Sequence, residues 1–144
     1  MEISLPSETI FHTIESTIKA YRKFAQQRIS EELENITIDQ SIALIHLAEY
    51  PDLTQNELAD LLFKDNASLT RMINTMVNNG FLKRSMNEED RRRFKLEITP
   101  HGEKVVETLP KIITNNRSIA LLGITDTELN QLNSLLRKIK SNCQ

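Results

Sequence analysis

The chain has 144 residues, 39% of them hydrophobic and 26% charged, which is typical of a soluble globular protein and excludes a disordered one. No apolar run approaches the roughly 20 residues of a membrane span, and the N-terminus lacks the basic flank of a signal peptide. We therefore expect a cytoplasmic protein with no membrane partner. The single cysteine, Cys143, cannot form an internal disulfide.

Basic charge is concentrated in one segment. Between Arg71 and Lys95 there are seven Lys or Arg against three Asp or Glu, a local charge of +4, whereas the other residues sum to −6. Such an excess predicts a surface that binds a polyanion. A solvated charged turn is the alternative that charge alone leaves open.

The first predicted element is a long helix over residues 8–30, with Ser7 as its candidate N-cap. Its apolar stripe repeats every three or four residues: Ile10, Ile14, Ile18, Tyr21 and Ala25. A second helix is predicted to begin at the capping box formed by Thr37 and Gln40 and to end before Pro51. It is apolar over much of its circumference, which predicts a buried helix.

A short helix is predicted next, from Thr54 to about Phe63. Thr54 and Glu57 form a capping box, and Leu53 and Leu58 occupy the two staple positions around it. Another helix is predicted to follow directly, so the pair indicates a helix-turn-helix.

Asp65 is the predicted N-cap of that second helix, which should end at Asn79 because Gly80 stands where a left-handed residue is favoured. At 100° per residue, one stripe forms the predicted core face: Leu69, Met72, Ile73 and Met76, with Val77 at its margin. The opposite face has short polar side chains around one arginine and no acid.

This polar face is a candidate for binding the major groove, where Arg can pair with guanine and Asn with adenine. The predicted DNA-binding residues of the recognition helix are Asn66, Ala67, Ser68, Thr70, Arg71, Asn74 and Thr75. An ordinary solvent face is the alternative, although such faces usually carry mixed Glu and Lys.

Two strands are predicted over residues 81–85 and 93–98, joined by a loop, with Phe94, Leu96 and Ile98 on one side. A helix-turn-helix followed by a hairpin is a winged helix. The predicted DNA-binding residues of the wing are Lys83, Arg84, Asp90, Arg91, Arg92 and Arg93. A wing arginine can enter the minor groove, and Asp90 is expected to orient Arg92 through a charge-assisted hydrogen bond.

A long helix is predicted to begin at Thr99 and Pro100 and to kink at Pro110, which has no N–H to donate. Gly123 should end that segment, and a capping box at residues 125–128 begins a final helix with an apolar stripe: Leu129, Leu132, Leu135, Leu136 and Ile139. The first and last helices have apolar stripes that the winged lobe cannot bury. A homodimer is the simplest arrangement that covers them.

The predicted fold class is mainly α: a winged helix-turn-helix with a two-stranded β wing, flanked by long N- and C-terminal dimerisation helices. The predicted boundaries are 1–34 for the N-terminal dimerisation helix, 35–100 for the DNA-binding lobe and 101–144 for the C-terminal dimerisation helices.

Five motifs resemble, in order and spacing, those of the MarR family of bacterial transcription regulators: Leu53-Thr-Gln-Asn-Glu-Leu-Ala59, Asp65 with Thr70-Arg71, Asn79-Gly80-Phe81-Leu82-Lys-Arg84, Asp90-Arg-Arg92, and Ile98-Thr99-Pro-His-Gly102. The resemblance implies an obligate homodimer, a recognition helix in successive major grooves, and Arg92 in the minor groove. Many members also bind a small, often aromatic or phenolic, effector between the lobes. Candidate pocket residues, for which core packing is the alternative role, are Ile14, Ile18, His46, Leu62 and Phe63.

Other functions find less support in the sequence. The first helix lacks the reactive cysteine of hydroperoxide-sensing members, and His12, His46 and His101 are too scattered to predict a metal site. We expect no cofactor and no enzymatic activity, because no phosphate loop or catalytic grouping is present. The predicted function is a sequence-specific, homodimeric DNA-binding regulator, a repressor of a pseudo-palindromic operator that a small effector relieves. The alternative is a winged-helix protein-interaction module that does not bind DNA.

Overall fold

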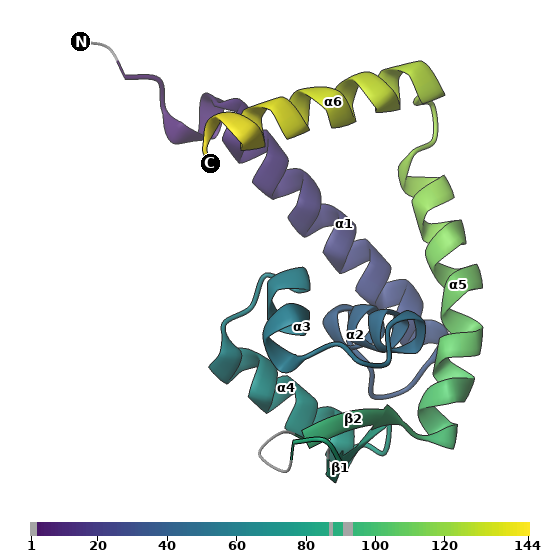
Figure 1. The fold of residues 1–144 in the computed structure, drawn as a ribbon. Helices are drawn as coiled ribbons and strands as arrows, with labels where there is room; N and C mark the ends of the chain where they lie inside the picture. Colours follow the sequence, from purple (N-terminus) through teal and green to yellow (C-terminus); the bar gives the residue numbers. More distant parts are fainter. Residues whose placement is uncertain (1–2, 87, 91–93) are drawn as a thin grey trace.

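The computed structural model describes residues 3–86, 88–90 and 94–144. Its elements run in the order η1 (Pro6–Glu8), α1 (Ile10–Glu32), α2 (Ile38–Glu49), α3 (Gln55–Leu61), α4 (Asn66–Asn78), β1 (Leu82–Met86), β2 (Phe94–Ile98), α5 (Pro100–Ala120) and α6 (Asp126–Asn142). Figure 1 shows α2, α3, α4 and the hairpin gathered in one lobe, with α1 and α5 leading away from it to α6. The predicted winged helix with long flanking helices is confirmed.

The helices begin where the sequence places their caps. Thr37, Thr54 and Thr125 each form the complete predicted capping box. The carboxylate of Asp65 accepts a hydrogen bond from the backbone N–H of Ser68 at 2.7 Å, at the start of α4. Each of these bonds satisfies an N–H that the first turn leaves unpaired, so short helices such as α3 have fixed starting points.

The start of α1 differs from the prediction. Ser7 lies inside the 3-10 turn η1, and the N-cap is Thr9, whose side chain accepts a hydrogen bond from the backbone N–H of His12. Pro6 favours this turn because its fixed φ suits the first position and it has no N–H to satisfy. The prediction of Ser7 as the cap was therefore wrong by two residues.

Gly80 has the left-handed conformation predicted for it, with φ +80°, and Gly123, which was predicted only to end its segment, has the same φ. Gly80 follows the end of α4, and Gly123 lies between α5 and α6. Pro110 does not interrupt α5, which continues through it as one helix of 21 residues. The kink expected at Pro110 stays a prediction.

The hairpin register determines which side chains face the core. Leu82 pairs with Ile98, Arg84 with Leu96 and Met86 with Phe94, so these six residues share one face of the two-stranded sheet. Leu96 and Ile98 are half-buried, but Phe94 is 69% exposed because the strand extends beyond the core there. The three β2 side chains predicted to share a side do so, although the outermost leaves the core.

The hydrophobic core lies between α4, the hairpin and the facing sides of α1, α2 and α5. Its fully buried side chains include Leu44, Leu58, Leu69, Ile73, Met76, Phe81 and Leu109. In contrast, α6, which is described throughout, buries none of its residues, and Leu132 and Leu135 are 48% and 60% exposed. Among the described residues, no helix is long and apolar enough to span a membrane.

Candidate nucleic-acid interface

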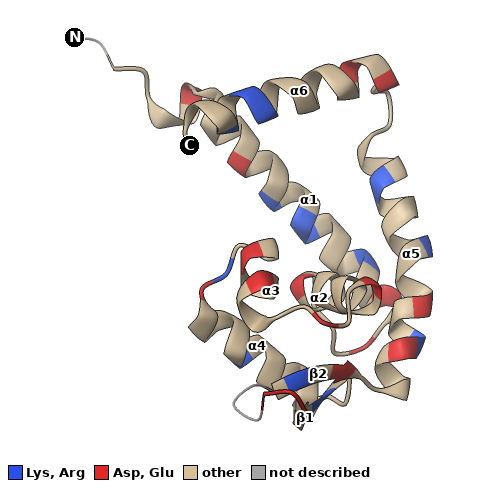
Figure 2. Ribbon diagram, in the orientation of Figure 1, with Lys and Arg blue, Asp and Glu red and all other residues tan. Residues whose placement is uncertain are grey.

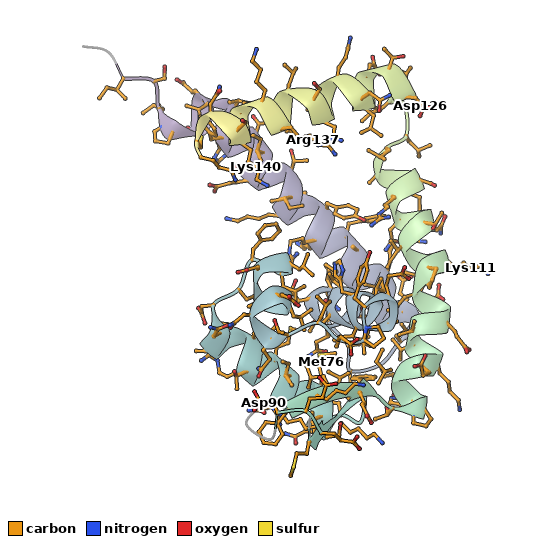
Figure 3. The ribbon with its side chains drawn as sticks, in the orientation of Figure 1. Met76, Asp90, Lys111, Asp126, Arg137 and Lys140 are labelled. Atoms are coloured by element: carbon orange, nitrogen blue, oxygen red, sulfur yellow. The ribbon has the colours of Figure 1, made fainter. Side chains whose placement is uncertain are left out.

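Helix α4 divides into a buried and an exposed face. Leu69, Ile73 and Met76 are fully buried, and Met72 is half-buried, which confirms the predicted core face. Of the predicted DNA-facing residues, Ser68 is half-buried. The others are exposed: Asn66, Ala67, Thr70, Arg71, Asn74 and Thr75. Their contact with DNA stays a prediction. Figure 3 shows Met76 on the inner side of α4, beside the hairpin.

A short network holds the only arginine of α4. Arg71 donates a hydrogen bond to the hydroxyl of Ser68 at 3.1 Å, and that hydroxyl donates to Asp65 at 3.3 Å. Hydrogen bonds from the backbone and side chain of Ser68 lower the pKa of Asp65, and the charge of Arg71 lowers it further. Asp65 therefore caps the helix and also fixes the partner of Arg71, a second role that the sequence analysis missed.

The hydroxyls on the same face are paired within the protein. Thr70 donates to the carbonyl of Asn66 at 2.8 Å, and Thr75 donates to the carbonyl of Arg71 at 3.1 Å. Gln55, at the start of α3, donates to Thr70 at 3.5 Å. Gln55 thus borders the recognition face although the sequence analysis did not include it, and its position at the first residue of α3 was the available signal.

Two of the predicted wing residues, Lys83 and Arg84, lie on opposite faces of β1. Lys83 pairs with the carboxylate of Glu97 at 3.3 Å, and Ser85 donates to the same carboxylate at 3.2 Å. These two hydrogen bonds lower the pKa of Glu97, the one from Lys83 most. Arg84 instead reaches α4 and donates to the side-chain oxygen of Asn74.

The remaining wing predictions are only partly described. Asp90 is exposed, and Figure 3 shows it at the outer end of the wing. Arg91, Arg92 and Arg93 lie outside the described residues, so the expected pairing of Asp90 with Arg92 stays a prediction. Figure 2 shows Lys and Arg on α4 and on the strands at the same end of the molecule.

The turn of the helix-turn-helix is tied to the rest of the lobe by an ion cluster. Asp39 of α2 accepts from Arg22 of α1 at 2.5 Å and from Lys64 of the α3–α4 turn at 3.0 Å. Burial raises the pKa of Asp39, but the hydrogen bonds and charges of Arg22 and Lys64 outweigh it and lower that pKa below the usual value. This cluster therefore couples three segments that position α4.

The five candidate effector residues lie in different surroundings, and their role in an effector pocket stays a prediction. Leu62 belongs to the core, Ile14 and His46 are half-buried, and Ile18 is 50% exposed. Phe63 is 95% exposed in a left-handed conformation, with φ +55°. A groove of about 610 Å³ contains none of them and is lined by Arg28, Glu32, Pro110, Lys111, Ile112, Thr114, Asn115 and Ser118.

The described residues contain no cluster of His, Cys, Asp and Glu that could hold a metal ion. The functional features are instead an exposed helix face with amide, hydroxyl and guanidinium groups and, beside it, a hairpin with Lys83, Arg84 and Lys95 on its strands. Such groups recognise base edges and phosphates. The class defined by this arrangement is a winged helix-turn-helix protein of the DNA-binding type.

Residues 36–94 match the MarR family model. The chain is 27% identical over 136 residues to a putative transcriptional regulatory protein for the hcr operon of Thauera aromatica, covering 94% of this chain and 81% of that protein. It is 26% identical over 110 residues to the uncharacterized HTH-type transcriptional regulator YybA of Bacillus subtilis, covering 76% and 73%. The match confirms the resemblance to the MarR family noted in the motifs, and it identifies residues 36–94 as the MarR-type winged helix of a DNA-binding transcription regulator.

Solved structures have the same fold. The Staphylococcus aureus MepR–DNA complex matches with a TM-score of 0.85 at 22% identity, covering 94% of this chain and 99% of that one. A mutant Escherichia coli MarR bound to operator DNA matches with a TM-score of 0.84 at 24% identity, covering 95% and 99%. Bordetella bronchiseptica BpsR matches with a TM-score of 0.84 at 21% identity, covering 96% of this chain and 98% of that one. The DNA binding of BpsR is regulated by 6-hydroxynicotinic acid.

Proposed function

We propose that this regulator binds a pseudo-palindromic operator as a homodimer and represses transcription from it. The observation that carries the proposal is the acid-free, exposed face of α4. It lies at one end of the molecule beside the hairpin, whose sequence over residues 82–98 has six Lys or Arg against four Asp or Glu. In this arrangement α4 reads base edges in the major groove and the wing contacts the flanking backbone and minor groove.

The dimer is proposed to form through residues 1–34 and 101–144, and residues 35–100 form the DNA-binding lobe. Support comes from apolar side chains far from the core: Ile10 and Phe11 of α1 are 54% and 56% exposed, and Leu132 and Leu135 of α6 are exposed to a similar extent. A second copy related by twofold symmetry would cover both sets. Replacing Leu132 and Leu135 with Asp should yield a monomer, whereas replacing Gln131 and Ser134 on the same helix should not.

A twofold dimer predicts the layout of its operator. The two α4 helices would enter major grooves on one side of the duplex, with half-site centres about 10 bp apart. The test is to select duplexes from a randomised pool with the full-length protein and then to measure binding of the selected duplex against salt. We expect an inverted repeat and an affinity that falls steeply as salt rises, because Lys and Arg displace counterions from phosphates. Weak, salt-insensitive binding would indicate that the winged helix is not a DNA-binding module.

We further propose that a small aromatic or phenolic effector relieves repression. The support is the fold shared with BpsR, whose DNA binding 6-hydroxynicotinic acid regulates. An effector can act only if it binds one spacing of the two recognition helices better than the other. Titration of 6-hydroxynicotinic acid and of simple phenols into the complex with the selected duplex tests this proposal, and release of the duplex is the expected result.

A further inference from the structure

The contact between Arg84 and Asn74 joins the wing to the recognition helix. In the hairpin register Arg84 shares a face with Leu82, which packs into the core beside α4, so its side chain is directed toward that helix. Its guanidinium donates to Oδ1 of Asn74, and both residues are exposed on the surface proposed to face DNA. The side chain of Lys83, one residue earlier, lies on the opposite face of β1 and pairs with Glu97.

The chemistry of the two side chains fixes the orientation of the Asn74 amide. Arg has only donors, so the amide must present its oxygen to Arg84 and leave the Nδ2 group, with two N–H donors, on the other side. A hydrogen bond from a charged donor is roughly twice as strong as a neutral one, so a base must compete for that oxygen. The oxygen keeps a second lone pair, but the part of Asn74 that Arg84 does not engage is the Nδ2 group with its two donors.

This orientation changes what Asn74 can read. The familiar pairing of Asn with adenine is bidentate: the amide oxygen accepts from N6 while the amide nitrogen donates to N7. With one lone pair of its oxygen bound to Arg84 and the amide held in place by that bond, Asn74 keeps both donors, whereas the acceptor half of the bidentate pair is already engaged. Guanine presents two acceptors, N7 and O6, and thymine presents O4 with no amino donor beside it. Adenine also has an acceptor, N7, but its N6 amino donor lies next to it and would face the Asn74 donors without an acceptor.

We propose that Arg84 is a positioning residue that makes Asn74 select guanine or thymine, rather than adenine, at one position of each half-site. The inference rests on the proposed DNA-binding function and differs from the pairing with adenine that the sequence suggests for an Asn in the major groove. It also assigns Arg84 a role in base specificity in addition to any contribution of its charge to DNA affinity.

The experiment selects duplexes from a randomised pool with the full-length protein and five variants. Asn74→Ala identifies the position that Asn74 reads, because the preference there is lost. Arg84→Met removes the donor but keeps a long side chain, and Arg84→Lys keeps a donor. Lys83→Met is the charge-matched control on the opposite face of β1, and Asn74→Asp replaces the donor with a second acceptor. Circular dichroism and thermal melting establish that each variant is folded.

We expect the wild-type protein and Arg84→Lys to prefer guanine or thymine at the identified position. Arg84→Met should raise the relative enrichment of adenine there by about fivefold or more, since the bidentate pair becomes available. Lys83→Met should lower affinity without changing that preference. Asn74→Asp should shift the preference toward cytosine or adenine, whose amino groups are donors.

The outcomes separate the inference from the proposed function. A wild-type preference for adenine at this position, or an unchanged preference in Arg84→Met, would overturn the inference while leaving DNA binding intact. An Asn74→Ala variant with the same preferences as wild type at every position would also overturn it. If the wild-type protein enriches no sequence, both the proposed function and the inference fail.

Discussion

Gly102 lies directly against the backbone of Phe81. A Cβ atom on Gly102 would stand 2.3 Å from the carbonyl oxygen of Phe81 and 2.7 Å from Cγ2 of Ile98. The same carbonyl accepts the N–H of Thr99 at 3.1 Å, and the hydroxyl of Thr99 donates to the carbonyl of Gly80 at 2.5 Å. The segment that follows the recognition helix, the last residue of β2 and the first turn of α5 are therefore in direct contact.

Gly102→Ala should destabilise the fold by about 1–3 kcal/mol, the usual cost of forcing extra volume into a packed site. The sign is informative because Ala is otherwise the better helix former by about 1 kcal/mol. Urea unfolding measures the difference. Gly123→Ala is the comparison: φ is +80° there, but nothing among the described residues lies within 4 Å of its added Cβ. It should cost less, and a Gly102→Ala variant as stable as wild type would contradict the close contact.

Asp39→Asn should weaken the fold at neutral pH by about 1 kcal/mol or less, since its partners are partly exposed. The pKa of Asp39 is lowered in the folded protein relative to 3.8, so its contribution is present above that value and is lost as the pH falls through the folded pKa. The free energies of unfolding of wild type and variant, measured in urea, should therefore differ at pH 7 and become equal in acid. Asp52→Asn, an exposed carboxylate with the same change in charge, is the control. A difference that persists unchanged in acid would show that the charge of Asp39 is not responsible.

Asn116→Ala should cost about 1–3 kcal/mol of stability because it leaves a polar group without its partner. Asn116 is 1% exposed, and its Oδ1 accepts from Nε of Arg28 at 2.6 Å, which ties α5 to α1. The guanidinium of Arg28 also lies 5.6 Å from the centre of the Phe24 ring. Asn115→Ala, on the neighbouring exposed position, should stay within about 0.5 kcal/mol of wild type. Thermal melting of the two variants compares them, and equal melting temperatures would rule out the buried contact as a stabilising one.

Arg71→Ala and Arg92→Ala should affect DNA binding differently. Arg71 is exposed on α4, so its loss should cost about 1–3 kcal/mol of binding free energy on the selected duplex. It should also reduce the difference in affinity between the selected duplex and random DNA. Arg92 is expected to gain from minor-groove potential, so its loss should weaken both complexes and most where the flanks are rich in A·T. Fluorescence anisotropy with both duplexes separates the two effects. Equal losses of specificity in the two variants would contradict this division of roles.

The sequence was sufficient for features that depend on local chemistry. The capping boxes at Thr37, Thr54 and Thr125 each satisfy backbone groups within one helical turn, and the left-handed Gly80 follows from its place after the helix. The start of α1 was missed because Thr9, a second good cap, lies two residues from Ser7. Local pattern could not choose between them.

Contacts between distant residues were not accessible in the same way. Arg84 and Asn74 are ten residues apart on different elements, and only the hairpin register shows that Arg84 turns toward α4 while Lys83 turns away. The Asp39 cluster likewise joins three segments whose packing angles no single stretch of sequence specifies. Composition indicated a basic surface, whereas the partner of each charge came from the structure.

Two copies of this chain are proposed to read a twofold-symmetric operator, and sedimentation of the protein with its selected duplex measures how many chains bind each duplex. We predict a free protein of about twice 16.6 kDa and a complex with two chains on each duplex. Nuclease footprinting of the same complex should show protection of two inverted half-sites centred about 10 bp apart. A well-behaved monomer that protects one asymmetric site on the duplex would contradict it.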